Sequence, residues 1–224
     1  MGCDDDFNRN SWDQIGCHDC GKSFTSMLGE NCCMSCCRKT PNPFRKIKIH
    51  MGCGKRDFGR GWFNIDGADF PHIHWHDATS IPFNNNSVDL IYCCHMLPFF
   101  DRQEVVPVLL EWKRVLNPGG ILRLAVSDFE TIAKLYSNGK YSLSNFLGPM
   151  FGKWEMNGKY VYEKTIYDYV SLKELLNSIG MRNIRRYNQF ETEHSQFDDH
   201  SFAFLPHMDF TNGICISLNV ECDK

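Results

Sequence analysis

The chain has 224 residues with a formal net charge of −3, and 42% of its residues are hydrophobic and 23% charged, which excludes a chain that is disordered throughout. The longest stretch free of Asp, Glu, Lys, Arg and His, residues 141–152, is well short of the ~20 residues of a membrane helix. The net charge gives no global basic field for nucleic acid, and the acidic start Met1–Asp6 is no secretory signal, so we expect a cytoplasmic protein.

The first forty residues form a cysteine-rich segment. It contains two C-x-x-C pairs separated by twelve residues, formed by Cys17, Cys20, Cys33 and Cys36. Two such turns can present four thiolates to one tetrahedral Zn²⁺, and a segment this small needs a metal to fold. We therefore predict structural zinc on these four cysteines. Cys32 and Cys37 are alternative ligands, and a metal-free tail is the other interpretation.

Aromatic residues accompany the first cysteine pair. With Trp12 and Phe24 on either side, the segment resembles the first half of a FYVE-type zinc finger. The basic signature and later ligands of that family are missing, so the resemblance implies no phosphoinositide binding. Pro41 and Pro43 then indicate a linker, which favours a zinc-binding segment at 1–40 and a second domain at 41–224.

The second domain shows strands alternating with helices. We expect strands at 46–51, 61–66, 72–76, 88–94 and 121–126, and a half-buried one at 214–220. Helices are expected at 103–116, 127–138 and 171–179. This alternation indicates an α/β domain with a mostly parallel sheet. The first two strands are separated by only 52–61, too short for the usual crossover helix, so we expect an open cleft there.

Three features follow the first three predicted strands: the turn Gly52–Gly54, Asp66 and Asp77. Ligands of such sheets bind beyond the carboxyl ends of the central strands, where glycines leave bare backbone and acids can bind hydroxyl or amino groups. Two nucleotide motifs do not fit. Arg56 replaces the Ser or Thr of a P-loop, and Asp57 replaces the third glycine of a dinucleotide fingerprint.

An ordered set of motifs across residues 46–222 resembles class I S-adenosylmethionine-dependent methyltransferases, most closely the compact type 11 group. The motifs are Met51–Gly54, Asn64–Asp66, Ile81–Phe83, Ser87–Ile91 and Arg114–Gly120. The resemblance implies a Rossmann-like, mostly parallel sheet with a C-terminal antiparallel strand. It also implies S-adenosyl-L-methionine as the cofactor.

The resemblance implies roles for individual residues. Gly52, Cys53 and Gly54 would line the methionine and ribose, and Asp66 would bind the ribose hydroxyls. Asp77 and Ala78 would contact the adenine. Cys94 and His95 would border the transferring methyl. His95, at the end of a central strand, is our candidate general base. The segment at 194–209 is polar and is expected to face the acceptor, with ordinary loop polarity or a second metal site as the alternatives.

The sequence therefore predicts a methyltransferase acting on a small-molecule or glycan acceptor, with a hydroxyl as the methyl acceptor by family analogy. One alternative is an inactive methyltransferase-like binding protein, because Pro98 stands where relatives usually have an acid that contacts the methionine end. The other is an RNA or protein methyltransferase recruited by the zinc segment, favoured by the basic stretch 38–60. The sequence does not indicate an oligomeric state.

Overall fold

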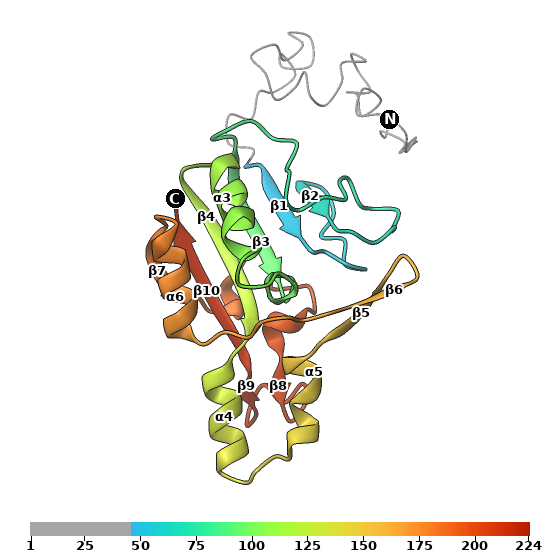
Figure 1. Cartoon of the computed structure of the whole chain (residues 1–224), viewed down its shortest axis with the longest axis vertical. Coiled ribbons are helices and arrows are strands. Elements are labelled where there is room, and N and C mark those ends of the chain that lie inside the picture. Colours follow the sequence, from blue (N-terminus) through green and yellow to red (C-terminus); the bar gives the residue numbers. More distant parts are fainter. Residues whose placement is uncertain (1–45) are drawn as a thin grey trace. The chain divides into compact units, whose positions relative to one another are not determined.

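The computed structural model describes residues 46–224, and their core is a six-stranded sheet with strand order β2-β1-β3-β4-β10-β7 (Figure 1). The strands are β1 (Lys48–Met51), β2 (Trp62–Ile65), β3 (Val88–Cys94), β4 (Leu116–Ser127), β7 (Arg182–Arg186) and β10 (Ser217–Asp223). Strands β1 to β4 pair in parallel, and β10 runs antiparallel to both of its neighbours, β4 and β7. The predicted Rossmann-like sheet with a C-terminal antiparallel strand is confirmed.

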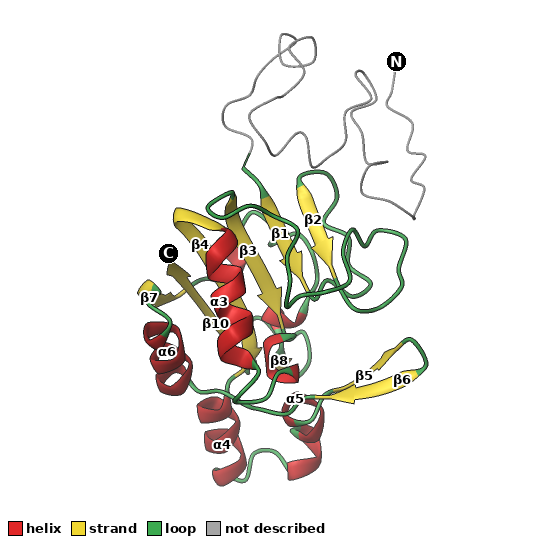
Figure 2. Cartoon of the chain, turned by 45° about the horizontal axis from the view of Figure 1, so that its top comes forward, coloured by secondary structure: helices red, strands yellow, loops and turns green. Residues whose placement is uncertain are grey.

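Helices cover one face of this sheet. Figures 1 and 2 both show α3 (Val105–Val115) and α6 (Tyr169–Ser178) on the same side. The apolar residues of α3 form one buried stripe, which includes Val105, Leu109 and Trp112. Pro107 lies in the first turn of α3, where its missing N–H would have no partner within the helix.

The opposite face of the sheet is covered by aromatic rings from loops. Phe58, from the connection between β1 and β2, stacks on His50 with ring centroids 3.9 Å apart. His194 lies 3.9 Å from the ring of Tyr92, and Phe197 lies 4.4 Å from Phe58. The connection at 52–61 carries no helix, as its length predicted, and these rings cover the strands in its place.

Two expected strands differ from the prediction. Residues 72–76 form no strand and contribute only a bridge between Trp75 and Ile65. A side chain takes the place of a backbone partner there, because His74 Nδ1 accepts the hydrogen bond of the Asn64 amide. Strand β10 is buried on both faces rather than half-buried. Its Asn219 donates hydrogen bonds from Nδ2 to the Gln189 side chain and the Ser201 carbonyl, which lie in the loops that cover it.

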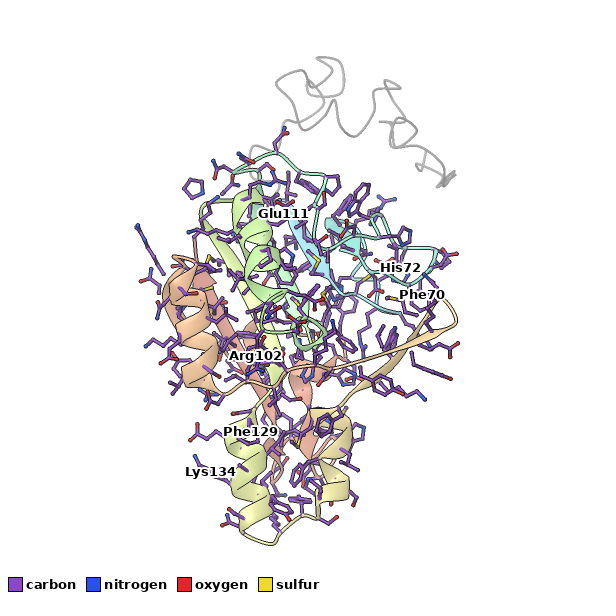
Figure 3. The ribbon with its side chains drawn as sticks, viewed as in Figure 1. Phe70, His72, Arg102, Glu111, Phe129 and Lys134 are labelled. Atoms are coloured by element: carbon purple, nitrogen blue, oxygen red, sulfur yellow. The ribbon has the colours of Figure 1, made fainter. Side chains whose placement is uncertain are left out.

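A long insertion separates β4 from α6 and was only partly predicted. It contains α4 (Phe129–Ser137), α5 (Leu147–Met150) and a hairpin of β5 (Lys153–Met156) and β6 (Lys159–Tyr162). The predicted helix at 127–138 is present, but its buried side chains are Ile132 and Leu135, whereas Phe129 and Tyr136 are exposed (Figure 3). A second small hairpin pairs β8 (Phe204–Leu205) with β9 (Ile214–Cys215).

The predicted zinc ligands Cys17, Cys20, Cys33 and Cys36 lie outside residues 46–224. Within that range, no helix has the length and apolar character needed to span a membrane.

Candidate active site

A cavity of about 970 Å³ lies at the carboxyl ends of the parallel strands, with the β5–β6 hairpin along one side. Its size is that of a small-molecule site, and its place is where ligands bind in such sheets. Among its lining residues are most of those predicted from the sequence, namely Gly52, Cys53, Gly54, Asp66, Ala78, Cys94 and His95. The strand order therefore brings together residues from four separate parts of the chain.

The turn after β1 exposes bare backbone to this cavity. Gly52 and Gly54 have φ angles of +67° and +55°, which favour glycine. A Cβ added to Gly52 would lie 2.4 Å from the Cβ of Met96, so no side chain fits there. A hydrogen bond also holds the turn in place, because the ring of His72 donates from Nε2 to the Gly54 carbonyl at 2.9 Å.

Asp66 lines the cavity directly after β2 and is held by two backbone amides. Its Oδ2 accepts from the Gly54 amide and its Oδ1 from the Ala68 amide, both at 2.8 Å. A carboxylate oxygen has two lone pairs, so each oxygen keeps one for a further donor. Asp66 therefore both closes the glycine turn and is available to a pair of hydroxyl groups.

Asp77 has a different environment. It is exposed and does not line the cavity, and its Oδ1 accepts from the Thr79 amide at 2.8 Å and from the Thr79 hydroxyl at 2.6 Å. This is the turn geometry that an aspartate commonly adopts. The adjacent Ala78 does line the cavity, and the Trp112 indole fixes it by donating to its carbonyl at 2.8 Å. The adenine contact of Asp77 stays a prediction.

His95 lies at the end of β3, as expected, in an unusual backbone conformation with φ +52°. Its amide donates to the Ala125 carbonyl at 2.8 Å, and its Nε2 lies 3.4 Å from the Ser217 hydroxyl. Burial, with a contribution from the nearby His200, lowers the pKa of His95 to about 3. The ring is therefore neutral near pH 7. It is a weaker base than a catalytic residue whose pKa lies near the working pH.

The cavity thiols are protonated near neutral pH. Burial and the charge of Asp199 raise the pKa of the Cys94 thiol well above its ordinary value. Burial, with a smaller contribution from Asp66, also raises the pKa of Cys53. Thiolate is the reactive form of cysteine, so neither residue is suited to act as a nucleophile.

The polar segment at 194–209 mostly packs against the sheet. Asp199 is buried and accepts a 2.5 Å hydrogen bond from the Tyr92 hydroxyl, and His194 stacks between aromatic rings. His200 reaches the cavity lining. Residues 46–224 contain no group of three or more His, Cys, Asp or Glu side chains that could hold a metal ion.

The hairpin supplies lining residues that the sequence analysis missed. A Cβ added to Gly54 would lie 3.6 Å from the Trp154 ring, and one added to Gly67 would lie 2.5 Å from the Met156 sulfur. The hairpin therefore lines part of the cleft that the short connection 52–61 leaves without a helix. A signal was present in the sequence: Asn157-Gly158 is the preferred tight hairpin turn, and both residues have positive φ.

Residues 60–124 match the family model described as "Methyltransferase domain". The matched stretch runs from β2 through most of β4 and includes Asp66 and His95, but it begins after the glycine turn. The match agrees with the resemblance of the sequence motifs to class I S-adenosylmethionine-dependent methyltransferases, and it supports the predicted methyltransferase. No curated protein matches the sequence.

Solved structures with a similar fold have low sequence identity to this chain. A possible histamine N-methyltransferase from Thermotoga maritima has 13% identity and a TM-score of 0.45, with coverage of 79% of this chain and 81% of that chain. A methyltransferase from Methanosarcina mazei has 17% identity and a TM-score of 0.47, with coverage of 79% and 91%. A Burkholderia thailandensis 1,6-didemethyltoxoflavin-N1-methyltransferase with bound S-adenosylhomocysteine has 10% identity and a TM-score of 0.45, with coverage of 79% and 70%.

Proposed function

We propose that this chain binds S-adenosyl-L-methionine in the cavity and transfers its methyl group to a small-molecule or glycan acceptor. The observation that carries this proposal is the pairing of Gly54 with Asp66. The Gly54 amide of the glycine turn donates a hydrogen bond to the Asp66 carboxylate. This carboxylate lines the cavity and keeps two free lone pairs. This arrangement fits a nucleoside, because its ribose presents two adjacent hydroxyl groups to one carboxylate.

The cofactor, when bound, supplies a methyl group already activated on a sulfonium. The chain therefore has to orient the acceptor rather than generate a reactive group, and orientation can contribute ~7–11 kcal/mol. Asp66 would hold the ribose and the Gly52–Gly54 backbone would lie against the ribose and methionine part. Cys94 and His95 border the same cavity at the end of β3, where the acceptor would approach.

The acceptor group is proposed to be a hydroxyl, with His95 as its hydrogen-bond acceptor. A neutral imidazole has one nitrogen with a free lone pair, and the lowered pKa keeps His95 in that form near pH 7. In this role His95 orients the hydroxyl. Replacing His95 with Ala should then reduce turnover more than cofactor affinity, and equal turnover would remove His95 from the reaction.

Calorimetry with S-adenosylmethionine and S-adenosylhomocysteine tests the proposal. Asp66→Ala should weaken binding by ~1.5–3 kcal/mol, the value of hydrogen bonds to a charged group. Asp66→Asn is a matched variant, because it keeps one oxygen acceptor and the side-chain shape. Unchanged affinity in Asp66→Ala would refute the ribose assignment.

A second candidate is a cofactor-binding protein without turnover. Pro98 is the observation that favours it, because the chain resembles enzymes that carry an acid at this position. A methyl-transfer assay on a pool of sugars and small metabolites separates the two candidates. Cofactor binding without transfer to any acceptor would favour the second.

We also propose that segment 1–40 holds one structural zinc ion on Cys17, Cys20, Cys33 and Cys36. The support is the C-x-x-C spacing alone. Elemental analysis of the purified full chain should find about one zinc per chain. Absence of zinc from protein purified without chelator would contradict the proposal.

A further inference from the structure

The two faces of the β5–β6 hairpin differ in exposure. Trp154 pairs with Val161, and the side chains of a strand alternate between its faces. One face carries Trp154, Met156 and Val161, which are half-buried, and Glu163 follows in the same alternation just beyond β6. The other face is exposed and carries Lys153, Glu155, Tyr160 and Tyr162. Residues of both faces line the cavity, and Glu163 lines it from the less exposed face.

The hairpin follows the cavity from one end to the other. At its tip, Asn157 donates from Nδ2 to the Gly67 carbonyl, beside Asp66. In the middle, the Trp154 ring lies against Gly54. At its base, the Lys164 amide donates to the Pro98 carbonyl at 2.8 Å. Glu163 therefore lies at the Pro98 end of the cavity, away from the ribose end.

Glu163 has an unusual environment for a carboxylate. Its Oε2 is buried and has no hydrogen-bond partner within residues 46–224. Burial raises the pKa of Glu163 to about 7, although the Gly152 amide offsets part of this effect. A carboxylate oxygen buried without a partner destabilises the fold, and Glu163 also lines the cavity, so this residue is a candidate to bind a ligand group there.

The other two carboxylates that line the described cavity already have partners. Two backbone amides bind Asp66. Glu104 accepts from the Lys164 ammonium at 2.7 Å and from the Asp101 amide at 2.8 Å. Glu163 is therefore the lining carboxylate most available to a cation carried by a ligand.

We propose that Glu163 binds the ammonium group of the cofactor's methionine moiety and replaces, from the hairpin, the acid that Pro98 lacks. This inference rests on the proposed function. The cofactor is the expected source of the ammonium group because Trp154 and Met156, on the same face as Glu163, lie against Gly54 and Gly67 at the nucleoside end. A ligand that extends along this face from Gly67 reaches Glu163 with its far end.

Calorimetry with two ligands tests the proposal on the full chain at pH 8. One ligand is S-adenosylhomocysteine, and the other is its deamino analogue, in which hydrogen replaces the amino group. The variant is Glu163→Gln, which keeps the side-chain volume. Glu155→Gln on the exposed face of the same hairpin is the matched control. Thermal unfolding of each variant confirms that it is folded.

Glu163→Gln should weaken binding of S-adenosylhomocysteine by about 10- to 100-fold and leave the deamino analogue within about 2-fold, because only the first ligand loses a charge-assisted hydrogen bond. Glu155→Gln should change neither affinity. Equal weakening of both ligands, or no weakening of either, would overturn the assignment of Glu163. A wild-type chain that binds neither ligand would instead refute the proposed function itself, on which the assignment rests.

Discussion

The two walls of the cavity show different relations between sequence and structure. We use "strand-end wall" for Gly52–Gly54, Asp66 and Cys94–His95, and "hairpin wall" for residues 152–163. The strand-end wall is made of residues that directly follow strands, and the sheet alone brings them together. The hairpin wall belongs to an insertion after β4 and reaches the same cavity from outside the sheet. The first wall therefore depends on the sheet, and the second on the segment between β4 and α6.

The largest expected effect concerns the strand-end wall. Gly52→Ala should lower the free energy of unfolding by ~2–5 kcal/mol, because the added Cβ would clash with Met96 in a backbone conformation that already favours glycine. Gly119→Ala is the control. Gly119 also has a positive φ, but a Cβ there meets no atom within 4 Å, so it should cost only ~1–3 kcal/mol. Equal urea unfolding curves for the two variants would contradict the close packing at Gly52.

The next effect tests whether the strand-end wall binds the nucleoside. Asp66→Ala should weaken S-adenosylhomocysteine binding by ~1.5–3 kcal/mol. The deamino analogue should lose a similar amount, because Asp66 lies at the end opposite Glu163. Titration calorimetry of both ligands checks this. A loss confined to S-adenosylhomocysteine would assign Asp66 to the amino end and reverse the proposed orientation.

The pH dependence of ligand affinity tests the hairpin wall. Below its pKa of about 7, Glu163 is protonated in the free protein and cannot pair with an ammonium group. Affinity for S-adenosylhomocysteine should therefore fall by about 10-fold between pH 8 and pH 6, and this dependence should be lost in Glu163→Gln.

His76 and His200 also line the cavity, so the comparison with Glu163→Gln is what assigns the dependence, whereas the nearby cations have other partners. Lys164 is paired with Glu104, Lys153 lies over the Tyr160 ring, and Arg56 binds the Asp198 carbonyl. The pKa of His95, at about 3, leaves that ring neutral throughout the range. A pH dependence that persists in Glu163→Gln would show that another group is responsible.

The smallest effect is on stability without ligand. The folded protein raises the pKa of Glu163, so its ionisation destabilises the fold above pH 7, and this penalty is absent below the unfolded-state pKa near 4.5. Glu163→Gln should therefore stabilise the free protein at pH 8 by ~1–2 kcal/mol after allowance for solvent screening, and by less at pH 5. Urea unfolding at both pH values measures this, and a destabilised variant at pH 8 would contradict the account of Glu163.

The sequence allowed prediction of the strand-end wall because each of its residues is defined by local pattern. Asp66 follows a short apolar strand and Gly52 follows an alternating one, so their meeting at one sheet edge could be inferred. The hairpin had its own signal in Asn157-Gly158. The two tyrosines beside it, Tyr160 and Tyr162, are exposed and line the cavity.

The remaining features depend on contacts between distant residues. Glu163 lies against Gly152, and the next two residues, Lys164 and Thr165, are bonded to Pro98, more than sixty residues earlier in the chain. The low pKa of His95 likewise requires the loop that carries His200. Neither property has a local pattern from which it could be predicted.

Titration of the wild-type chain and of Asp66→Ala with S-adenosylhomocysteine tests the central claim most directly. The claim is that the cavity between these walls binds an adenosine whose ribose pairs with Asp66. It predicts binding of one S-adenosylhomocysteine per wild-type chain and weaker binding to Asp66→Ala. No heat from the wild-type chain, or equal affinity in the two chains, would contradict it.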